Sequence, residues 1–187
     1  MVATRLDIQH RHETLFFCPG EYKRPDIKIN VYEVRETAAR RAIWEQFRKY
    51  HYLNTELHIA ARQFVGMIGE EIVAHTGVIY FPMRKGWKRI HRFVVLPDYQ
   101  GCGIGTAFIE KVCDLMSDEG FKTNLTTTTP ALVKALTRSP KWSLNRFGRA
   151  KGGWGNSFNP TKNLDNATSN NRVTYSFNYK KESCLKK

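Results

Sequence analysis

A short β-branched run that ends at a proline and leads into closely spaced glycines constrains this chain more than any other stretch. The run is Val94-Val95-Leu96-Pro97, and Gly101, Gly103 and Gly105 follow at alternate positions, before an amphipathic segment that begins near Thr106. Glycines at this spacing let the backbone curl with its N–H groups pointing inward, and a helix that starts there adds partial positive charge. The stretch therefore predicts a pyrophosphate cradle between a strand and a helix, although an ordinary strand-to-helix turn also needs one or two glycines.

Length and composition favour one α/β domain with a core of its own. The chain has 187 residues, 41% of them hydrophobic, and no apolar run long enough to span a bilayer. Its first ten residues lack the apolar centre of a signal peptide, so we expect a cytoplasmic protein without a membrane partner. We expect an irregular N-terminal extension over 1–27 with room for one short strand, one domain over 28–180, and a basic tail over 181–187.

Hydrophobic periodicity predicts an alternation of strands and helices along the domain. Helices are expected from Glu36 to about Tyr50, from Thr106 to about Gly120, and from Pro130 onward. The stretch 142–171 is dominated by Gly, Asn, Ser, Thr and Lys, which predicts a long loop. Strands are expected over 28–34, 62–68, 72–81, 87–96, 121–128 and 172–180.

The string from Val94 to Gly105 resembles the acyl-CoA-binding signature of the GNAT superfamily of N-acetyltransferases. Gln100, Gly103 and Gly105 fill the three positions of its usual form, Arg/Gln-x-x-Gly-x-Gly/Ala. The predicted order of elements over 28–180 is also the GNAT order. The resemblance implies a single α/β (α+β) domain with a mixed, mostly antiparallel sheet flanked by helices, and an N-acyltransferase that uses acetyl-CoA or another acyl-CoA.

The resemblance also implies which residues hold the cofactor. Main-chain N–H groups of the glycine turn would bind the pyrophosphate, and the preceding strand would pair with the pantetheine arm as an added strand would. The implied cofactor-binding residues are Phe93, Val94, Val95, Leu96, Gln100, Gly101, Cys102, Gly103, Ile104, Gly105 and Thr106.

Histidine is the expected general base, because imidazole accepts an ammonium proton near neutral pH. His91 lies nine positions before Gln100, a spacing similar to that of the catalytic histidine in arylalkylamine-type GNAT enzymes. His51 is the rival, together with its neighbour Tyr52, and His75 is a weaker candidate. A partly exposed strand histidine and a packed aromatic corner are the structural alternatives. No glutamate lies within 87–96, so the glutamate-base variant of the family is not supported.

The general acid departs from the family pattern. Many GNAT enzymes place a tyrosine on the helix that follows the fifth strand, where it protonates the departing thiolate. Thr137 falls at about that position here, and Ser139 is the nearby candidate. The four cysteines show no metal-ligand spacing with histidine, so we expect free thiols and no metal site.

The net charge of +13 points to a polyanionic partner in addition to CoA. The stretch 121–164 holds no acidic residue, and its cations alternate with aromatic residues that offer stacking surfaces to unpaired bases. A solvated loop whose aromatic residues pack on the core is the alternative. The candidate nucleic-acid-binding residues are Arg84, Lys85, Arg146, Arg149, Lys151 and Trp154.

The acceptor is accordingly expected to be DNA, RNA or a molecule associated with them. Phage Mom-type proteins, which modify DNA adenine, are a GNAT-like precedent, and three short segments look similar to GNAT modules of phages and of ABC-ATPase fusions. They are Tyr50 to Leu53, Thr137 to Trp142 and Thr174 to Tyr179. A small-amine or protein acetyltransferase, and a GNAT fold kept only for binding, remain alternatives. The oligomeric state is left open.

Overall fold

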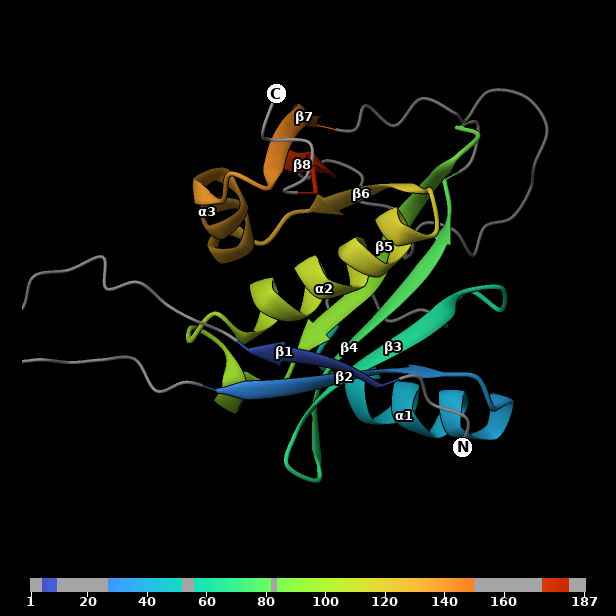
Figure 1. Cartoon of the computed structure of the whole chain (residues 1–187). Helices are drawn as coiled ribbons and strands as arrows, with labels where there is room; N and C mark the ends of the chain where they lie inside the picture. The colour runs from blue at the N-terminus through green and yellow to red at the C-terminus, as the bar shows by residue number, and fades with distance from the viewer. Residues whose placement is uncertain (1–4, 10–26, 52–55, 82–83, 150–172, 182–187) are drawn as a thin grey trace, which may run out of the picture.

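Eight strands form one sheet in the order β1-β2-β3-β4-β5-β6-β8-β7 (Figure 1). The computed structural model describes residues 5–9, 27–51, 56–81, 84–149 and 173–181. Every neighbouring pair is antiparallel except β5 and β6, which are parallel. The strands are β1 (Arg5–Gln9), β2 (Lys28–Val34), β3 (Arg62–Ile68), β4 (Glu71–Tyr80), β5 (Trp87–Val95), β6 (Lys122–Thr127), β7 (Trp142–Arg149) and β8 (Val173–Tyr179).

In the described part of the chain, three α-helices cover the two faces of the sheet, which confirms the expected fold class. They are α1 (Thr37–Arg48), α2 (Ile104–Asp118) and α3 (Pro130–Arg138). Successive side chains of a strand point to opposite faces, and on β3 the buried Phe64 joins the core beneath α2 while the buried Val65 joins the core beneath α1. α2 contributes most to the larger core and α1 to the smaller one.

The expected loop over 142–171 is wrong in its first part, because residues 142–149 form the edge strand β7. The register between β7 and β8 shifts between Leu144 and Arg146, which interrupts the alternation that marks a strand. Gly148, at φ 152, also weakens the local strand signal. β7 forms because β8, far away in the sequence, supplies its hydrogen-bonding partner. Residues 150–172 lie outside the described part of the chain.

The structure also bears on the smaller predictions about the N-terminal strand, the start of the second helix and the cysteines. The short strand for which the N-terminal extension left room is β1, and it pairs with β2. α2 begins at Ile104, two residues before the expected start. Cys102 and Cys113 are free thiols, whereas Cys18 and Cys184 lie outside the described residues. In the described ranges, no helix is long and apolar enough to cross a bilayer, and no group of three metal-ligating side chains comes together.

Candidate functional site

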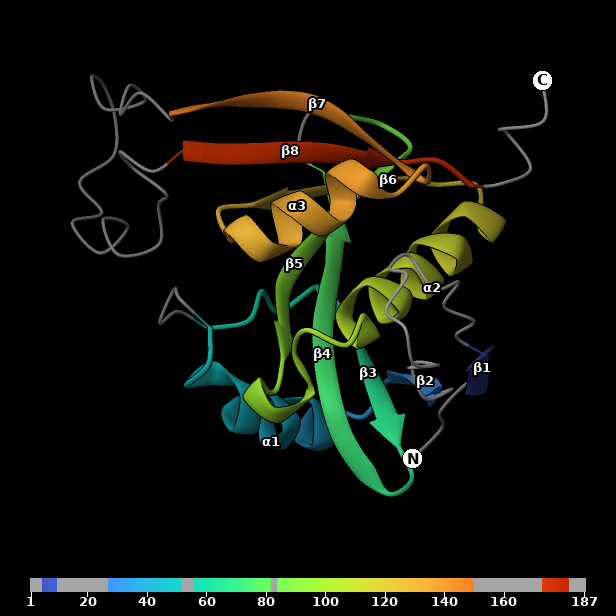
Figure 2. The same cartoon turned by 90° about the vertical axis from the view of Figure 1, so that its left-hand side faces the viewer.

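β5 has an open edge over its second half. Its parallel pairing with β6 covers three residue pairs and ends at Arg89↔Asn124. From Ile90 to Val95, β5 therefore has no described strand on that side, although β4 stays paired with it as far as Val95. Beyond Arg89, β5 diverges from β6, and β7 and β8 run across the direction of β4 (Figure 2). Phe93, Val94 and Val95 lie on an edge to which an extended ligand can add by main-chain hydrogen bonds.

A bulge in β5 redirects its side chains at this edge. His91 pairs with Gly77 and Val94 pairs with His75, so two residues, Arg92 and Phe93, oppose one on β4. Arg92 has a φ of 56°, a left-handed value that is uncommon for a residue with a side chain. Bulges of this kind are over-represented beside active sites, where they re-aim a side chain.

The glycine turn that follows β5 contains two residues in left-handed conformations. Gly101 and Gly103 have left-handed φ values of 85° and 89°, and a Cβ atom on Gly101 would meet open space. Glycine is therefore needed for the backbone angle rather than for room. Gly103 is also the N-cap residue of α2, where no side chain caps the helix and no acidic residue lies in the first turn. The first N–H groups of α2, from Ile104 to Thr106, are left to attract an anion.

Gly105 has a different reason to lack a side chain. A Cβ atom there would lie 3.0 Å from Cγ2 of Val95 and 3.1 Å from Cζ of Phe93. The absence of this atom lets the first turn of α2 pack directly on the end of β5. The helix N-terminus and the open strand edge are thereby brought side by side.

Side-chain hydrogen bonds tie the turn to the end of β5. Gln100 donates from Nε2 to the carbonyl oxygen of Val95 at 2.8 Å, and Cys102 donates from Sγ to the carbonyl oxygen of Tyr99 at 3.2 Å. The N–H of Leu96 donates to Val73 on β4 at 2.9 Å. In this structure the side chain of Gln100 thus positions the turn, which leaves main-chain N–H groups as the atoms offered to an anion.

Two of the expected histidines flank the bulge residue Arg92: His91 precedes it on β5, and the ring of His51 lies against its side chain. Nη1 of Arg92 lies 3.5 Å from Nδ1 of His51, and the pKa of His91 is lowered by nearby His51 and His58 among other groups. Nε2 of His91 is buried and has no hydrogen-bond partner among the described residues. A buried polar atom without a partner costs stability, so such atoms are rare in proteins. Where one occurs, a catalytic role is one of the usual reasons.

The surroundings of His91 keep its imidazole neutral. Burial lowers its pKa most, and the positive charges of Arg92 and Arg89 lower it further, to about 3. The ring therefore has a lone pair to offer at any physiological pH, but it is a weak base.

The other candidate catalytic residues have different placements. His75 is fully buried, with Nε2 3.2 Å from Oε1 of Gln63 and its ring against Trp44 and Phe47. Ser139 follows α3 and donates its hydroxyl to Oε1 of Glu110 at 3.0 Å. The structure therefore keeps His75 from solvent and engages the Ser139 hydroxyl with Glu110 of α2. Thr137 donates to its own helix, at Val133 O, and Tyr52 lies outside the described residues.

The basic residues expected to bind nucleic acid are divided between two ends of the sheet. Arg84 and Lys85 lie in the turn before β5, and the ladder Trp87↔Lys122, Asn124↔Asn178, Asn178↔Ser143 places that turn at the end where β7 begins. Arg146 is exposed on β7, and Arg149 is the last residue of β7, at the opposite end. Lys151 and Trp154 lie outside the described residues. Sequence reasoning missed the bulge at Arg92, which has no local sequence signal.

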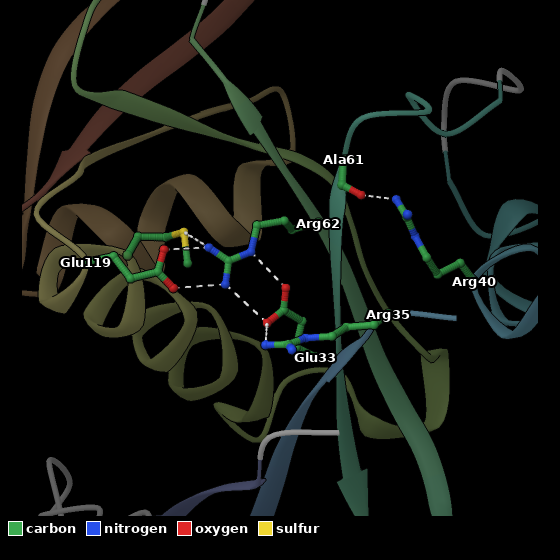
Figure 3. Close-up of polar contacts among 7 residues, drawn as sticks. Glu33, Arg35, Arg40, Ala61, Arg62 and Glu119 are labelled. Carbon is green, nitrogen blue, oxygen red and sulfur yellow. Dashed lines mark hydrogen bonds and ion pairs between the residues drawn. The ribbon is translucent and has the colours of Figure 1, made fainter. Parts of the chain in front are cut away.

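A charged network fixes the other end of α2 (Figure 3). Arg62 on β3 donates to Glu33 on β2 at 2.8 Å and to Glu119, directly after α2, at 2.5 and 2.9 Å. These hydrogen bonds raise the pKa of Arg62, and for Glu33 they outweigh the opposing effect of burial and lower its pKa. A cavity of about 410 Å³ lies beside this network, where Arg40 of α1 donates to the carbonyl oxygen of Ala61. Both features are at the end of α2 that is remote from the glycine turn.

Comparison with known proteins follows the same elements. Residues 29–136 match the family model described as Acetyltransferase (GNAT) family. The ribosomal-protein-S18-alanine N-acetyltransferase of Escherichia coli is 16% identical, with a TM-score of 0.56 over 81% of this chain and 92% of that one. The IAA acetyltransferase of Bacillus cereus ATCC 14579 is 14% identical, with a TM-score of 0.58 over 81% and 98%.

A third solved structure contains a ligand. The GNAT family acetyltransferase of Elizabethkingia anophelis, solved with acetyl-CoA bound, is 10% identical, with a TM-score of 0.52 over 82% of this chain and 98% of that one. At these identities the likeness shows the fold. No curated protein sequence matches the chain.

Proposed function

Because the chain belongs to the acetyltransferase (GNAT) family, we propose that it transfers an acyl group, in the simplest case acetyl, from acyl-CoA to an amine. The observation that carries this proposal is the position of the open β5 edge beside the uncapped N-terminus of α2. A CoA ester has an anionic pyrophosphate and an extended amide-containing arm. The N-terminus of α2 offers N–H groups to the pyrophosphate, and the open edge of β5 offers main-chain groups to the arm. The Cβ contacts of Gly105 support the fit, because only a residue without Cβ lets strand edge and helix meet so closely.

In this proposal the acceptor nitrogen attacks the thioester carbonyl, the C–S bond breaks, and CoA leaves as the thiolate. Main-chain N–H groups on the open edge of β5 would stabilise the negative charge that develops on the carbonyl oxygen. His91 accepts the proton that the nitrogen loses, directly or through water, and His51 is the alternative acceptor. Ser139 and Tyr52 stay predictions as further catalytic residues, and the thiolate can leave into water without an acid.

The acceptor in this proposal is a nucleic acid or a molecule presented by one. The net charge of +13 supports this acceptor. The pKa of His91, which burial and the neighbouring arginines lower to about 3, supports it as well. An alkylammonium has to lose a proton before it attacks, and so weak a base takes that proton poorly. The exocyclic amino group of a nucleobase is already uncharged at neutral pH, so only the proton released during attack has to be accepted.

Two alternatives to this proposal remain, and the first of them keeps a nucleic acid as the substrate. Base modification of phage DNA in the manner of Mom-type proteins would use the same site, and the likeness to phage and ABC-ATPase-associated modules stays a hypothesis of that kind. A small amine or a protein is the second. A cytoplasmic location also stays a prediction. Mass spectrometry of nucleosides and proteins from cells that express the chain separates a nucleic-acid acceptor from a protein acceptor, because the added mass lies on a different molecule, and the mass itself identifies the group added to a nucleoside.

Calorimetry with acetyl-CoA tests the cofactor assignment directly. A Gly103→Glu variant places a negative charge at the N-terminus of α2 and should abolish binding. Gly120→Glu is the matched control, because Gly120 has nearly the same backbone angle, φ 85°, and open space around a Cβ, but lies at the other end of α2. Absence of binding to the wild type, or equal binding by wild type and the Gly103 variant, would overturn the assignment.

A further inference from the structure

Four cations gather at the β4–β5 hairpin without a neutralising partner. They are Arg84 and Lys85 in the turn, Lys88 near the start of β5, and Lys122 at the start of the neighbouring β6. None of them forms an ion pair with any described residue, although other cations of the chain, such as Arg62, do. The positive charge of this group is therefore available to an anion from outside.

Aromatic rings contact three of these cations, Arg84, Lys88 and Lys122. Nζ of Lys88 lies 3.3 Å from the ring centroid of Tyr80 and 4.4 Å from that of Phe121. The guanidinium of Arg84 lies 5.3 Å from Trp87, which Nζ of Lys122 approaches at 5.8 Å. A cation–π contact fixes the position of a cation but, unlike a carboxylate, does not cancel its charge. Lys88 is only 4% exposed, which is rare for a lysine without an acidic partner.

The opposite face of the same hairpin end presents an aromatic side chain to solvent, because Tyr80 pairs with Lys88 whereas Trp87 and its neighbour Lys122 point to the other face. Tyr80 is 68% exposed although its ring contacts Lys88 on one side and meets Phe121 edge-on, at 6.2 Å and 89°. Exposed rings among phosphate-binding cations are the feature by which proteins hold unpaired bases. A duplex offers only the faces of its terminal bases, so the combination favours a single strand.

The hairpin surface adjoins the start of β5, the strand that carries His91. Trp87 precedes His91 by four residues on β5, which corresponds to about 13 Å along an extended strand. A polymer that binds the hairpin surface can therefore reach the open edge of β5, whereas a mononucleotide would have to choose between the two places.

We propose that the hairpin surface, defined by Tyr80, Arg84, Lys85, Trp87, Lys88 and Lys122, binds single-stranded nucleic acid and leads it to His91. The exposed cations Arg84, Lys85 and Lys122 contact phosphates as the strand passes around the end of the hairpin, and the exposed ring of Tyr80, against which Lys88 packs, stacks on a base. This inference rests on the proposed nucleic-acid acceptor and names the surface that would hold it. The backbone of single-stranded DNA and that of RNA carry the same phosphate chemistry, so the experiment includes both.

Fluorescence anisotropy with labelled oligo-dT, oligo-U and a duplex tests the proposal. At about 0.1 M salt, removal of two phosphate contacts by Arg84→Glu/Lys122→Glu should weaken single-strand binding by at least about 25-fold, and the salt slope should fall by about 1.4. Tyr80→Ala should lower the preference for single strand over duplex. Lys28→Glu/Arg41→Glu, at exposed positions on β2 and α1, changes the net charge equally and should leave affinity within a few-fold of wild type.

Specific results would overturn the proposal. They are unchanged affinity of the hairpin variant, equal loss in the Lys28/Arg41 control, and equally tight binding of a polyglutamate peptide of the same charge. A difference between oligo-dT and oligo-U assigns the natural strand as DNA or RNA and supports the surface in either case. Because both substituted cations are exposed, thermal unfolding should confirm that the variants fold.

The same proteins separate this inference from the proposed function. Acetyl-CoA binding by calorimetry should be unchanged in the hairpin variant, since the substituted residues lie at the end of β5 remote from the glycine turn. If the wild-type protein binds oligonucleotide but does not bind acetyl-CoA, the acyltransferase proposal alone is refuted. The converse result would refute the hairpin surface alone.

Discussion

Lowering the pH from about 7.5 to about 4.5 should reduce the free energy of unfolding by about 2.5 kcal/mol through His75 alone. The fully buried imidazole is packed against Trp44 and Phe47, and burial lowers its pKa from 6.5 to about 4. Below pH 6.5 the unfolded chain therefore takes up a proton that the folded chain refuses. The stability that a neutral His75 provides is complete above this pH and is lost as the pH falls toward 4, and single-site linkage over the stated interval gives the figure above.

Urea unfolding at both pH values measures this difference. His75→Gln removes the titrating group, so its loss of stability between the two pH values should be about 2.5 kcal/mol smaller than that of the wild type. Ile43→Val is the matched control: it opens the same small core, should lose about 1 kcal/mol at either pH, and should keep the wild-type pH dependence. If the Gln variant is as sensitive to acid as the wild type, burial of His75 is not the cause and the reasoning fails.

Three further predictions concern the site and its supports. His91→Ala should lower kcat by about 10²-fold with acetyl-CoA affinity nearly unchanged, as measured by steady-state kinetics and calorimetry; if His51→Ala causes that loss instead, the base is His51. Gly105→Ala brings a methyl group to 3.0 Å from a β5 side chain, so urea unfolding should report a loss of about 1–3 kcal/mol, and an unchanged midpoint would contradict the close packing. Arg62→Met removes charged hydrogen bonds from the largely buried Glu33 and should lower the unfolding free energy by about 2 kcal/mol, whereas a loss confined to low salt would indicate only surface charge.

Sequence reasoning succeeded where the determining interactions are local. The alternation over 28–34 predicted β2 with the observed bounds, the strand expected over 62–68 is β3, and the glycine spacing predicted the turn before α2. Left-handed backbone angles at Gly101 and Gly103 are a property that glycine itself makes available, so these positions can be read without a partner. The direction of the β5 side chains before the bulge also follows from alternation alone.

The features that escaped prediction depend on distant partners. The bulge at Arg92 arises from the register of β5 against β4, and nothing in the sequence around Arg92 announces a left-handed residue. β7 is a strand because β8 pairs with it. The engagement of Ser139 with Glu110 joins residues 29 positions apart, so a spacing argument for a general acid could not foresee it.

The short contact between β5 and β6 divides the sheet into two parts that share a seam of three residue pairs. A ligand that adds to the open edge of β5 would lengthen this seam and act as a missing strand. We therefore expect the free protein to unfold less cooperatively than the complex, with amide hydrogens of β6 and β8 exchanging before those of β3 and β4. At a cosubstrate concentration 100 times its Kd, binding adds about 2.7 kcal/mol to the stability of the native state, and exchange at β6 should slow in proportion.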